Sequence, residues 1–391
     1  MAAFDPAAAT AAYLSAMSPA AQAKAVAYTQ GGHWLLLWAA VVAVASAWLI
    51  VRSGLLVRAV GWAERKEARP VLAVAAATVV FLLVDFVIEL PWNVYANWGR
   101  EKAYGLTSQP LGGWLGEQVV SLVLSMVMML VFLEALYALM RRARRWWWAW
   151  AGAVTAVGML FLMALEPVFV EPLFNKYTPA PEGPTRAAVV ALAAKAGVPS
   201  DKIYIYDGSR QSNRYTANVS GLMGTARIAM SDVMFAKGAD AAEVRGVVGH
   251  EMGHYKHGHV YWQVLVFSVL AVLLLWIADR IFPWAARLMG SPAEVISDPV
   301  GLPVIMAIVA VLGLLVTPVV NTMTRLDEAD ADNFSLHVAN EPDGLAKALV
   351  KSAEYRAPSP SALEEALFYD HPSVGWRVRN AMNWKAAHTS P

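Results

Sequence analysis

Six long apolar segments constrain this 391-residue chain more than any other feature of its sequence. Each contains about 18–24 residues, which is long enough for a helix to cross the hydrocarbon core of a bilayer. They cover approximately residues 34–51, 71–90, 119–140, 146–165, 260–281 and 300–320. Hydrophobic residues make up 58% of the chain and charged residues only 16%, too apolar a balance for a water-soluble fold of this length. The sequence therefore predicts a mainly α-helical, multi-pass membrane protein, with the lipid bilayer as a partner.

The overall composition excludes several kinds of site. The chain has no cysteine, so disulfides, iron–sulfur clusters and thiolate-bound zinc are all ruled out. The formal net charge of +1 gives no indication of a nucleic-acid partner. Residues 1–32 are rich in alanine and almost free of positive charge, so they lack the basic start of a signal peptide and form at most a surface helix. Any zinc would have to be held by histidine and carboxylate side chains.

The predicted spans divide the chain into four domains. Residues 1–165 contain four transmembrane helices, 166–259 form a polar α/β unit, 260–320 contain two more transmembrane helices, and 321–391 form a polar C-terminal segment. Because two spans separate the two polar domains, both domains lie on the same side of the membrane. A single site can therefore be built from both of them.

The polar domain at 166–259 has the patterns of a helix, three strands and a second helix. Residues 185–196 have helical spacing and end at Gly197. Three segments between turn residues read as strands: 202–206, 214–219 and 225–230. A second helix is predicted to begin near Asp240, whose side chain can cap it, and Glu243 completes a capping-box pattern. We expect this helix to run towards the fifth span.

The second helix carries the motif His250-Glu251-Met252-Gly253-His254, which matches the H-E-x-x-H pattern of zinc metallopeptidases. Residues four apart lie on one helical face, so His250 and His254 can bind the same metal ion. Glu251 is turned by about 100° from His250, where it can reach a water molecule on that metal. Taken without its surroundings, the motif is also compatible with a charged surface helix that happens to carry histidines.

Residues 324–332, directly after the sixth span, offer a third protein ligand. Glu328 and Asp332 are four residues apart and share a helical face, so one can bind zinc while the other orients a zinc-bound histidine. Asp327 or Asp330 could replace Glu328 as the ligand. Alternatively, the acidic residues of this segment have no ligand role and are exposed to solvent in the first turn of a helix, where the helix dipole favours negative charge.

Other histidines fit a third ligand position less well. Position 260 is valine, where a metzincin would have histidine, and His257 and His259 are too close to His254 along the helix. His371 is followed by Arg377 and could donate a hydrogen bond to the oxyanion of a tetrahedral intermediate. By itself, however, His371 reads as an ordinary loop residue.

With these motifs in order, the chain resembles the type I CAAX prenyl endopeptidases, which are membrane-embedded zinc proteases of the gluzincin type. The resemblance covers about residues 90 to 380. It rests on an ordered series of motifs: Leu90-Pro91-Trp92 and Tyr95; 172–179; Glu182-Gly183; 207–210 with Ser212-Asn213; Arg227-Ile228; Ser231-Asp232; 250–254 with Gly258-His259; Arg325, Glu328 and Ala331-Asp332; and His371-Pro372 with Arg377.

The resemblance implies a Zn²⁺ ion bound by His250, His254 and Glu328. Glu251 would then be the general base and afterwards the proton shuttle. Asp332 occupies the place of a second acid in the family, described as a proton donor or as the partner of a zinc-bound histidine.

The resemblance also implies residues that meet the substrate. His371 and Arg377 would face the scissile carbonyl and the substrate backbone. The strand that starts at Asn213 would pair with the peptide as an added β-strand. The family has Asn-Ala-Tyr here, whereas this chain has Asn213-Arg214-Tyr215.

The function that the resemblance implies is hydrolysis of a peptide bond on the C-terminal side of a prenylated cysteine. The membrane would be a bacterial inner membrane or the endoplasmic reticulum. One alternative is a protease of the same chemistry that removes damaged, non-prenylated membrane proteins. A further alternative is a non-enzymatic membrane protein that binds metal only structurally.

Two further features bear on the membrane arrangement. Eukaryotic members of the family have seven spans around a water-filled chamber, whereas this sequence shows six; Asp85, Glu89 and Glu134 suit either a wetted chamber wall or helix ends at the interface. The arginine-rich stretches 52–69 and 141–145 favour a zinc site outside the cytoplasm by the positive-inside rule. The resemblance implies the opposite, a site that faces the cytosol, and we expect that orientation.

Overall fold

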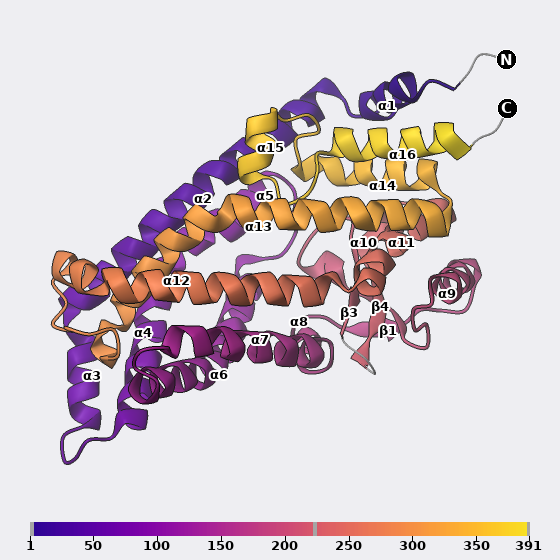
Figure 1. The fold of residues 1–391 in the computed structure, drawn as a ribbon. Helices are drawn as coiled ribbons and strands as arrows, with labels where there is room; N and C mark the ends of the chain where they lie inside the picture. The colour runs from indigo at the N-terminus through magenta and orange to yellow at the C-terminus, as the bar shows by residue number, and fades with distance from the viewer. Residues whose placement is uncertain (1–3, 222–224, 389–391) are drawn as a thin grey trace.

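The computed structural model describes residues 4–221 and 225–388 as a mainly helical molecule with one small sheet (Figure 1). Within these residues, six helices are long and apolar enough to cross a membrane. They contain α2 (Pro19–Ser53), α4 (Pro70–Asn93), α6 (Leu111–Arg142), α7 (Trp147–Leu165), α12 (His259–Met289) and α13 (Leu302–Ala339). The expected spans are confirmed, and the chain is a multi-pass integral membrane protein.

Several of these helices extend beyond the apolar segments. A short helix, α1 (Pro6–Ser15), precedes α2, which begins at Pro19 after an N-cap at Ser18. The first span is thus the second half of one long helix, and residues 19–32 are not a separate surface helix. Helix α4 continues through the π-helical turn Val94–Gly99 into the short helix α5 (Arg100–Ala103). Helix α7 continues through the π-helical turn Glu166–Val170 into the short helix α8 (Glu171–Phe174).

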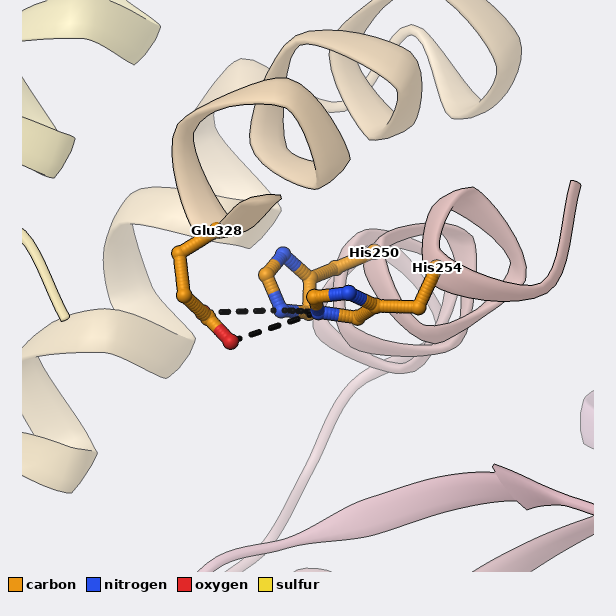
Figure 2. A group of neighbouring side chains, drawn as sticks. All are labelled: His250, His254 and Glu328. Carbon is orange, nitrogen blue, oxygen red and sulfur yellow. Dashed lines mark hydrogen bonds and ion pairs between the residues drawn. The ribbon is translucent and has the colours of Figure 1, made fainter. Parts of the chain in front are cut away.

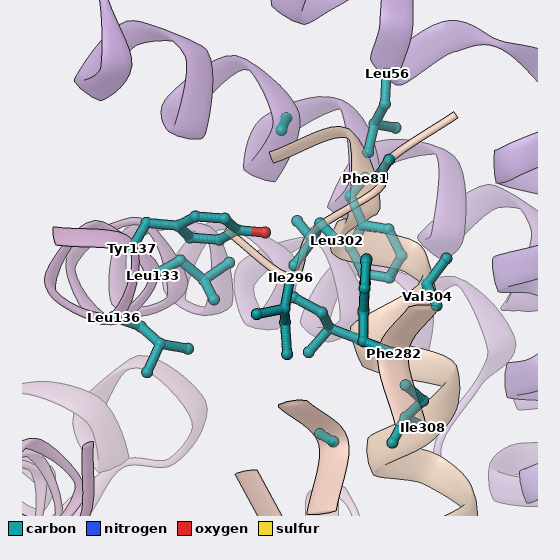
Figure 3. Close-up of a cluster of buried hydrophobic side chains, with 14 of the residues drawn as sticks. Leu56, Phe81, Leu133, Leu136, Tyr137, Phe282, Ile296, Leu302, Val304 and Ile308 are labelled. Carbon is teal, nitrogen blue, oxygen red and sulfur yellow. The ribbon is translucent and has the colours of Figure 1, made fainter. Parts of the chain in front are cut away.

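A hydrophobic core joins the membrane-spanning helices (Figure 3). Residues of α3 (Leu55–Ala63), α4, α6, α12 and α13 meet there. Of these helices, α3 lies at the end of the molecule away from the sheet (Figure 1). Tyr137, Phe282 and Leu302 are almost completely buried within it. The described residues of this core all belong to the membrane-spanning part and its connections, and none to the two polar domains.

The polar domain contains a four-stranded sheet in the order β1-β2-β4-β3. The strands are β1 (Tyr177–Pro179), β2 (Ile203–Tyr206), β3 (Ala217–Ser220) and β4 (Arg227–Ser231). The central pair β2 and β4 is parallel, and both outer strands pair antiparallel. The three predicted strands are present, but the second begins at Ala217 rather than at residue 214, and the sequence did not predict β1. Strand β3 lies at an edge of the sheet.

Three helices accompany the sheet: α9 (Pro184–Ala196), α10 (Asp232–Ala236) and α11 (Ala241–His257). Their apolar faces and the sheet bury a second core that includes Val189, Ile228, Met230, Val248 and Met252. This core fixes α11, which carries the H-E-x-x-H motif, against the sheet.

The last span does not end where its apolar segment ends. Helix α13 continues without a break to Ala339, so the acidic run lies deep within a helix rather than in its first turn. The C-terminal helices are α14 (Pro342–Ser352), α15 (Ala362–Phe368) and α16 (Val374–His388). In Figure 1, α14 and α16 lie along the C-terminal half of α13, with α1 beside them. These elements share a third buried core. The polar tail thus folds back onto the extended last span.

Candidate metal centre

Helix α11 begins as the sequence predicts. The side chain of Asp240 accepts a hydrogen bond of 2.8 Å from the backbone N–H of Glu243. This bond is the largest of the effects that lower the pKa of Asp240. The carboxylate of Glu243 accepts hydrogen bonds from Tyr215 at 3.2 Å and from Lys351 at 2.7 Å. The start of α11 is therefore tied to the segment just before β3 and to α14.

Glycines allow α11 and α13 to pack unusually closely. A Cβ atom at Gly253 would lie 3.0 Å from the Cα atom of Ala331, and one at Gly249 would lie 2.9 Å from the Ser335 hydroxyl. Ser335 also donates a hydrogen bond of 2.6 Å to the carbonyl of Gly246. Because the two backbones approach this closely, short side chains on α13 can reach those on α11.

His250, His254 and Glu328 converge across this contact (Figure 2), and we call them the metal centre. The Nε2 atoms of His250 and His254 are 3.2 Å apart. Glu328 places one carboxylate oxygen 3.2 Å from Nε2 of His250 and the other 3.3 Å from Nε2 of His254. Ligands about 2.0–2.1 Å from a tetrahedral metal ion are about 3.3 Å apart, so these three side chains have the spacing of a zinc site.

The surroundings of His250 and Glu328 also favour a cation between the three side chains. The Nδ1 atom of His250 is 2.9 Å from Asp332, and a carboxylate can only accept, so Nδ1 carries a hydrogen; in the neutral ring, the lone pair of His250 is then on Nε2, next to Glu328. The Oε2 atom of Glu328 is buried and accepts no hydrogen bond from the described residues. Burial alone would lower the pKa of His250, but the carboxylates of Glu328 and Asp332 outweigh it and raise that pKa to about 10. The site therefore attracts positive charge.

Asp332 is held by Arg377 of α16. The guanidinium donates two hydrogen bonds to the Asp332 carboxylate, of 2.6 and 2.7 Å. Both side chains are almost completely buried, so this is a two-point ion pair shielded from water. Asp332 thus lies behind His250 and does not face the other members of the metal centre. Arg377, predicted to face the substrate backbone, also binds this acid.

The metal centre opens into a cavity of about 310 Å³. Glu251 and both histidines line it, and so do Tyr215, Thr216 and Ala217 at the start of strand β3. Burial raises the pKa of Glu251 above the value usual for a glutamate. A partly enclosed carboxylate next to two potential metal ligands is suited to accept a proton from a nearby water molecule.

His371 reaches the same cavity from the loop before α16. Its Nε2 atom lies 3.3 Å from Glu328, and its Nδ1 donates a hydrogen bond of 2.8 Å to Asp370. Burial lowers the pKa of His371, although Asp370 acts in the opposite direction. Arg356, which the sequence did not single out, also lines the cavity, with a guanidinium nitrogen 3.4 Å from Nε2 of His371.

The alternative acidic ligands are engaged elsewhere. Asp327 accepts a hydrogen bond of 2.9 Å from Gln263 of α12, and Asp330 contacts His257 and His259. Of Glu328, Asp327 and Asp330, only Glu328 forms a group with the histidine pair.

Asn213 does not belong to an edge strand in this structure. Its backbone N–H donates a hydrogen bond of 2.8 Å to Leu106, and its side-chain amide donates one of 3.0 Å to the carbonyl of Gly105. The neighbouring Arg214 pairs with Glu101 at 2.6 Å. These contacts draw the chain towards the loop after α5, so regular pairing in β3 begins only at Ala217. Residues 215–217 border the cavity, and of these only Ala217 belongs to β3.

Comparison with known proteins agrees with this geometry. The model of peptidase family M48 matches residues 179–385, which contain the whole metal centre and its surroundings. The chain belongs to peptidase family M48. A second model, described as CAAX prenyl protease N-terminal with five membrane helices, matches residues 7–176. The resemblance expected from the motifs is thereby confirmed.

Relatives of this M48 protein occur in bacteria and eukaryotes. An uncharacterized metalloprotease, YhfN, of Bacillus subtilis is 26% identical over 324 residues, covering 82% of this chain and 76% of the relative. The CAAX prenyl protease 1 homolog of Arabidopsis thaliana is 26% identical over 297 residues, covering 75% and 69%. The crystal structure of S. mikatae Ste24p superposes with a TM-score of 0.77 at 20% identity, covering 94% of this chain and 90% of that one, so the two share a fold. Family membership identifies the chain as a metalloprotease.

Proposed function

We propose that this protein is a zinc-dependent membrane endopeptidase of the CAAX prenyl protease type, which cuts a peptide bond on the C-terminal side of a prenylated cysteine. The observation that carries the proposal is the convergence of His250, His254 and Glu328 beside Glu251 in one cavity. Two imidazoles and one carboxylate are the ligand set of catalytic zinc sites in metallopeptidases, which keep one position open for water or substrate.

Zinc held by these ligands would supply an electrophile and bring the pKa of a bound water close to 7. Glu251 accepts a proton from the attacking water and passes it to the leaving amine. The Nε2 atom of His371 lies 3.3 Å from Glu328. With both ring nitrogens protonated, His371 would keep its hydrogen bond to Asp370 through Nδ1 and donate from Nε2 to the oxyanion that forms at the scissile carbonyl. Asp332 holds His250 in the tautomer that keeps its Nε2 lone pair free.

The edge of the sheet offers a place for the substrate backbone. Residues 215–217, at the start of β3, line the same cavity as Glu251, and among the described strands β3 pairs with β4 alone. An extended peptide can add to such an edge by main-chain hydrogen bonds, which recognise its backbone and leave the side chains to be read by pockets. Asn213 would then anchor the chain segment that precedes this edge. Arg377, which lines the same cavity, would contact the substrate backbone.

The prenylated-cysteine specificity is supported by the relatives of the chain. Several carry the name CAAX prenyl protease 1, including those of Arabidopsis thaliana and Saccharomyces cerevisiae. The bacterial relative is named only as a metalloprotease, and clearance of non-prenylated membrane proteins is the rival function. Both functions use the same chemistry, so substrate choice is what separates them.

A competition assay tests the substrate. Purified protein is given a farnesylated peptide ending in a CAAX sequence, the same peptide without its lipid, and an unlipidated membrane-protein segment, and products are identified by mass spectrometry. The proposed function predicts cleavage directly after the farnesylated cysteine and little cleavage of the other two. Preferential cleavage of the unlipidated membrane segment would instead support the clearance function.

A further inference from the structure

A second group of metal-ligating side chains lies beside the metal centre and has no part in the proposed mechanism. It consists of His257, His259 and Asp330, and we call it the outer histidine cluster. One ligand atom from each residue lies within 4.8 Å of the others. His257 and His259 both contact the same oxygen of Asp330, the second at 3.0 Å. Three potential ligands therefore already point towards one position.

A helix break brings these residues together. On a continuous helix, residues two apart point in directions about 200° apart and cannot share a ligand. Here α11 ends at His257 and α12 begins at His259, and Gly258 between them has a left-handed backbone with φ of 66°. This turn directs both imidazoles towards Asp330 on α13. Helix α11 thus runs towards the fifth span as expected, and the two helices are separated at Gly258.

We propose that the outer histidine cluster is a second site for a divalent transition-metal ion, and that filling it weakens the metal centre. Two imidazole nitrogens and a carboxylate oxygen suit zinc, copper, nickel or cobalt better than magnesium or calcium. The side chains of His257 and Asp330 are 38% and 47% exposed, so an ion can enter from solution and keep water as its remaining ligands. This exposure also makes the site the weaker of the two.

The two sites are connected through one hydrogen bond. The Nδ1 atoms of His254 and His259 are 2.9 Å apart. When Nε2 of His254 offers its lone pair to the metal centre, its Nδ1 carries the hydrogen and donates to His259. His259 must then carry its own hydrogen on Nε2, which donates to Asp330 at 3.0 Å.

A metal ion in the outer histidine cluster requires the opposite arrangement. It takes the Nε2 lone pair of His259, so the hydrogen of His259 moves to Nδ1 and faces His254. His254 can then no longer donate from Nδ1, and its Nε2 is no longer free for the metal centre. Excess metal is therefore expected to inhibit the protein. This inhibitory part rests on the proposed function, whereas binding of a second ion does not.

Metal counting tests the binding part directly. Full-length protein in detergent is stripped with a chelator and dialysed against increasing Zn²⁺, and bound zinc is measured by mass spectrometry. We expect two ions per chain, the second at higher concentration, and one ion in His257→Ala and in Asp330→Asn. His337→Ala removes another exposed histidine of α13 and should still bind two. One ion in the wild type, or two in His257→Ala, would overturn the proposal.

Peptidase assays at one equivalent and at excess zinc test the inhibitory part. His257→Ala should match the wild type at one equivalent, because His257 is outside the metal centre. Excess zinc should lower wild-type activity by about tenfold or more and leave the variant nearly unaffected. Equal inhibition of both proteins would refute the connection between the sites. If no protein cleaves any substrate, the proposed function fails while the metal count still decides the second site.

Discussion

Arg377 binds Asp332 through two short hydrogen bonds in a nearly water-free environment, and Asp332 in turn accepts a hydrogen bond from His250. The pair links α16, near the C-terminus, to the motif helix α11. An acid in this position fixes both the tautomer and the orientation of a histidine ligand. The C-terminal polar segment is therefore part of the metal centre's support and not only a cover over it.

The first prediction concerns Asp332. Asp332→Asn keeps the size of the side chain but removes its charge and half of its acceptors, so His250 is less well oriented. We expect the affinity for zinc to fall about 10–100-fold, measured by competition with a chromogenic chelator. Asn333→Ala, next along α13 and exposed, serves as the control and should bind zinc like the wild type. Unchanged affinity in Asp332→Asn would show that the acid does not support the ligand.

Close packing of α11 on α13 gives the second prediction. Gly253→Ala places a methyl group 3.0 Å from the backbone of Ala331, so one helix must move. We expect a loss of about 1–3 kcal/mol in stability, read as a lower Tm in detergent, and weaker zinc binding. Gly313→Ala, on the partner helix α13, has nothing within 4 Å of the new methyl group and should be neutral or stabilising. Equal Tm values for the two variants would contradict the packing argument.

His371 provides the third prediction. Its removal leaves the metal ligands in place but takes away an imidazole that, when protonated on both nitrogens, donates to the oxyanion at the scissile carbonyl. For His371→Ala we expect kcat to fall about 10²–10³-fold with little change in KM or in bound zinc. His388→Ala, an exposed histidine at the end of α16, is the matched control. A change confined to KM would instead assign His371 to substrate binding.

The fourth prediction is a pH profile. Glu251 must be ionised to accept a proton, and burial raises its pKa above the usual value for a glutamate. Activity is therefore full above this raised pKa and is lost as the pH falls through it. We expect the acid limb of kcat/KM to lie above pH 4.5, while circular dichroism stays constant over the same range. An acid limb at or below that pH would mean that Glu251 is not the titrating base.

Much of the fold could be predicted from the sequence because its signals are local. Apolar length alone located the six spans, and the spacing of His250 and His254 placed them on one helical face. Among the acids after the last span, spacing left several candidates, since Glu328, Asp327 and Asp330 all lie within one helical turn. Only the packing of α11 on α13, which depends on long-range contacts, distinguishes them.

Other features depend on contacts that no local pattern records. The three-residue strand β1 is too short to show a period, and it forms because β2 offers an edge. The break at Gly258 is a single left-handed residue within an otherwise helical pattern. The two-point contact of Arg377 with Asp332 joins residues 45 positions apart. The side of the membrane that the site faces stays a prediction.

The most direct test of a zinc-dependent peptidase is Glu251→Gln, assayed for zinc content and for cleavage of the farnesylated peptide on the same purified sample. The substitution leaves His250, His254 and Glu328 unchanged, so zinc should remain at the wild-type level. Loss of the general base should lower cleavage about 10²–10⁴-fold. A Glu251→Gln protein that keeps its zinc and cleaves the peptide at the wild-type rate would contradict the proposed mechanism.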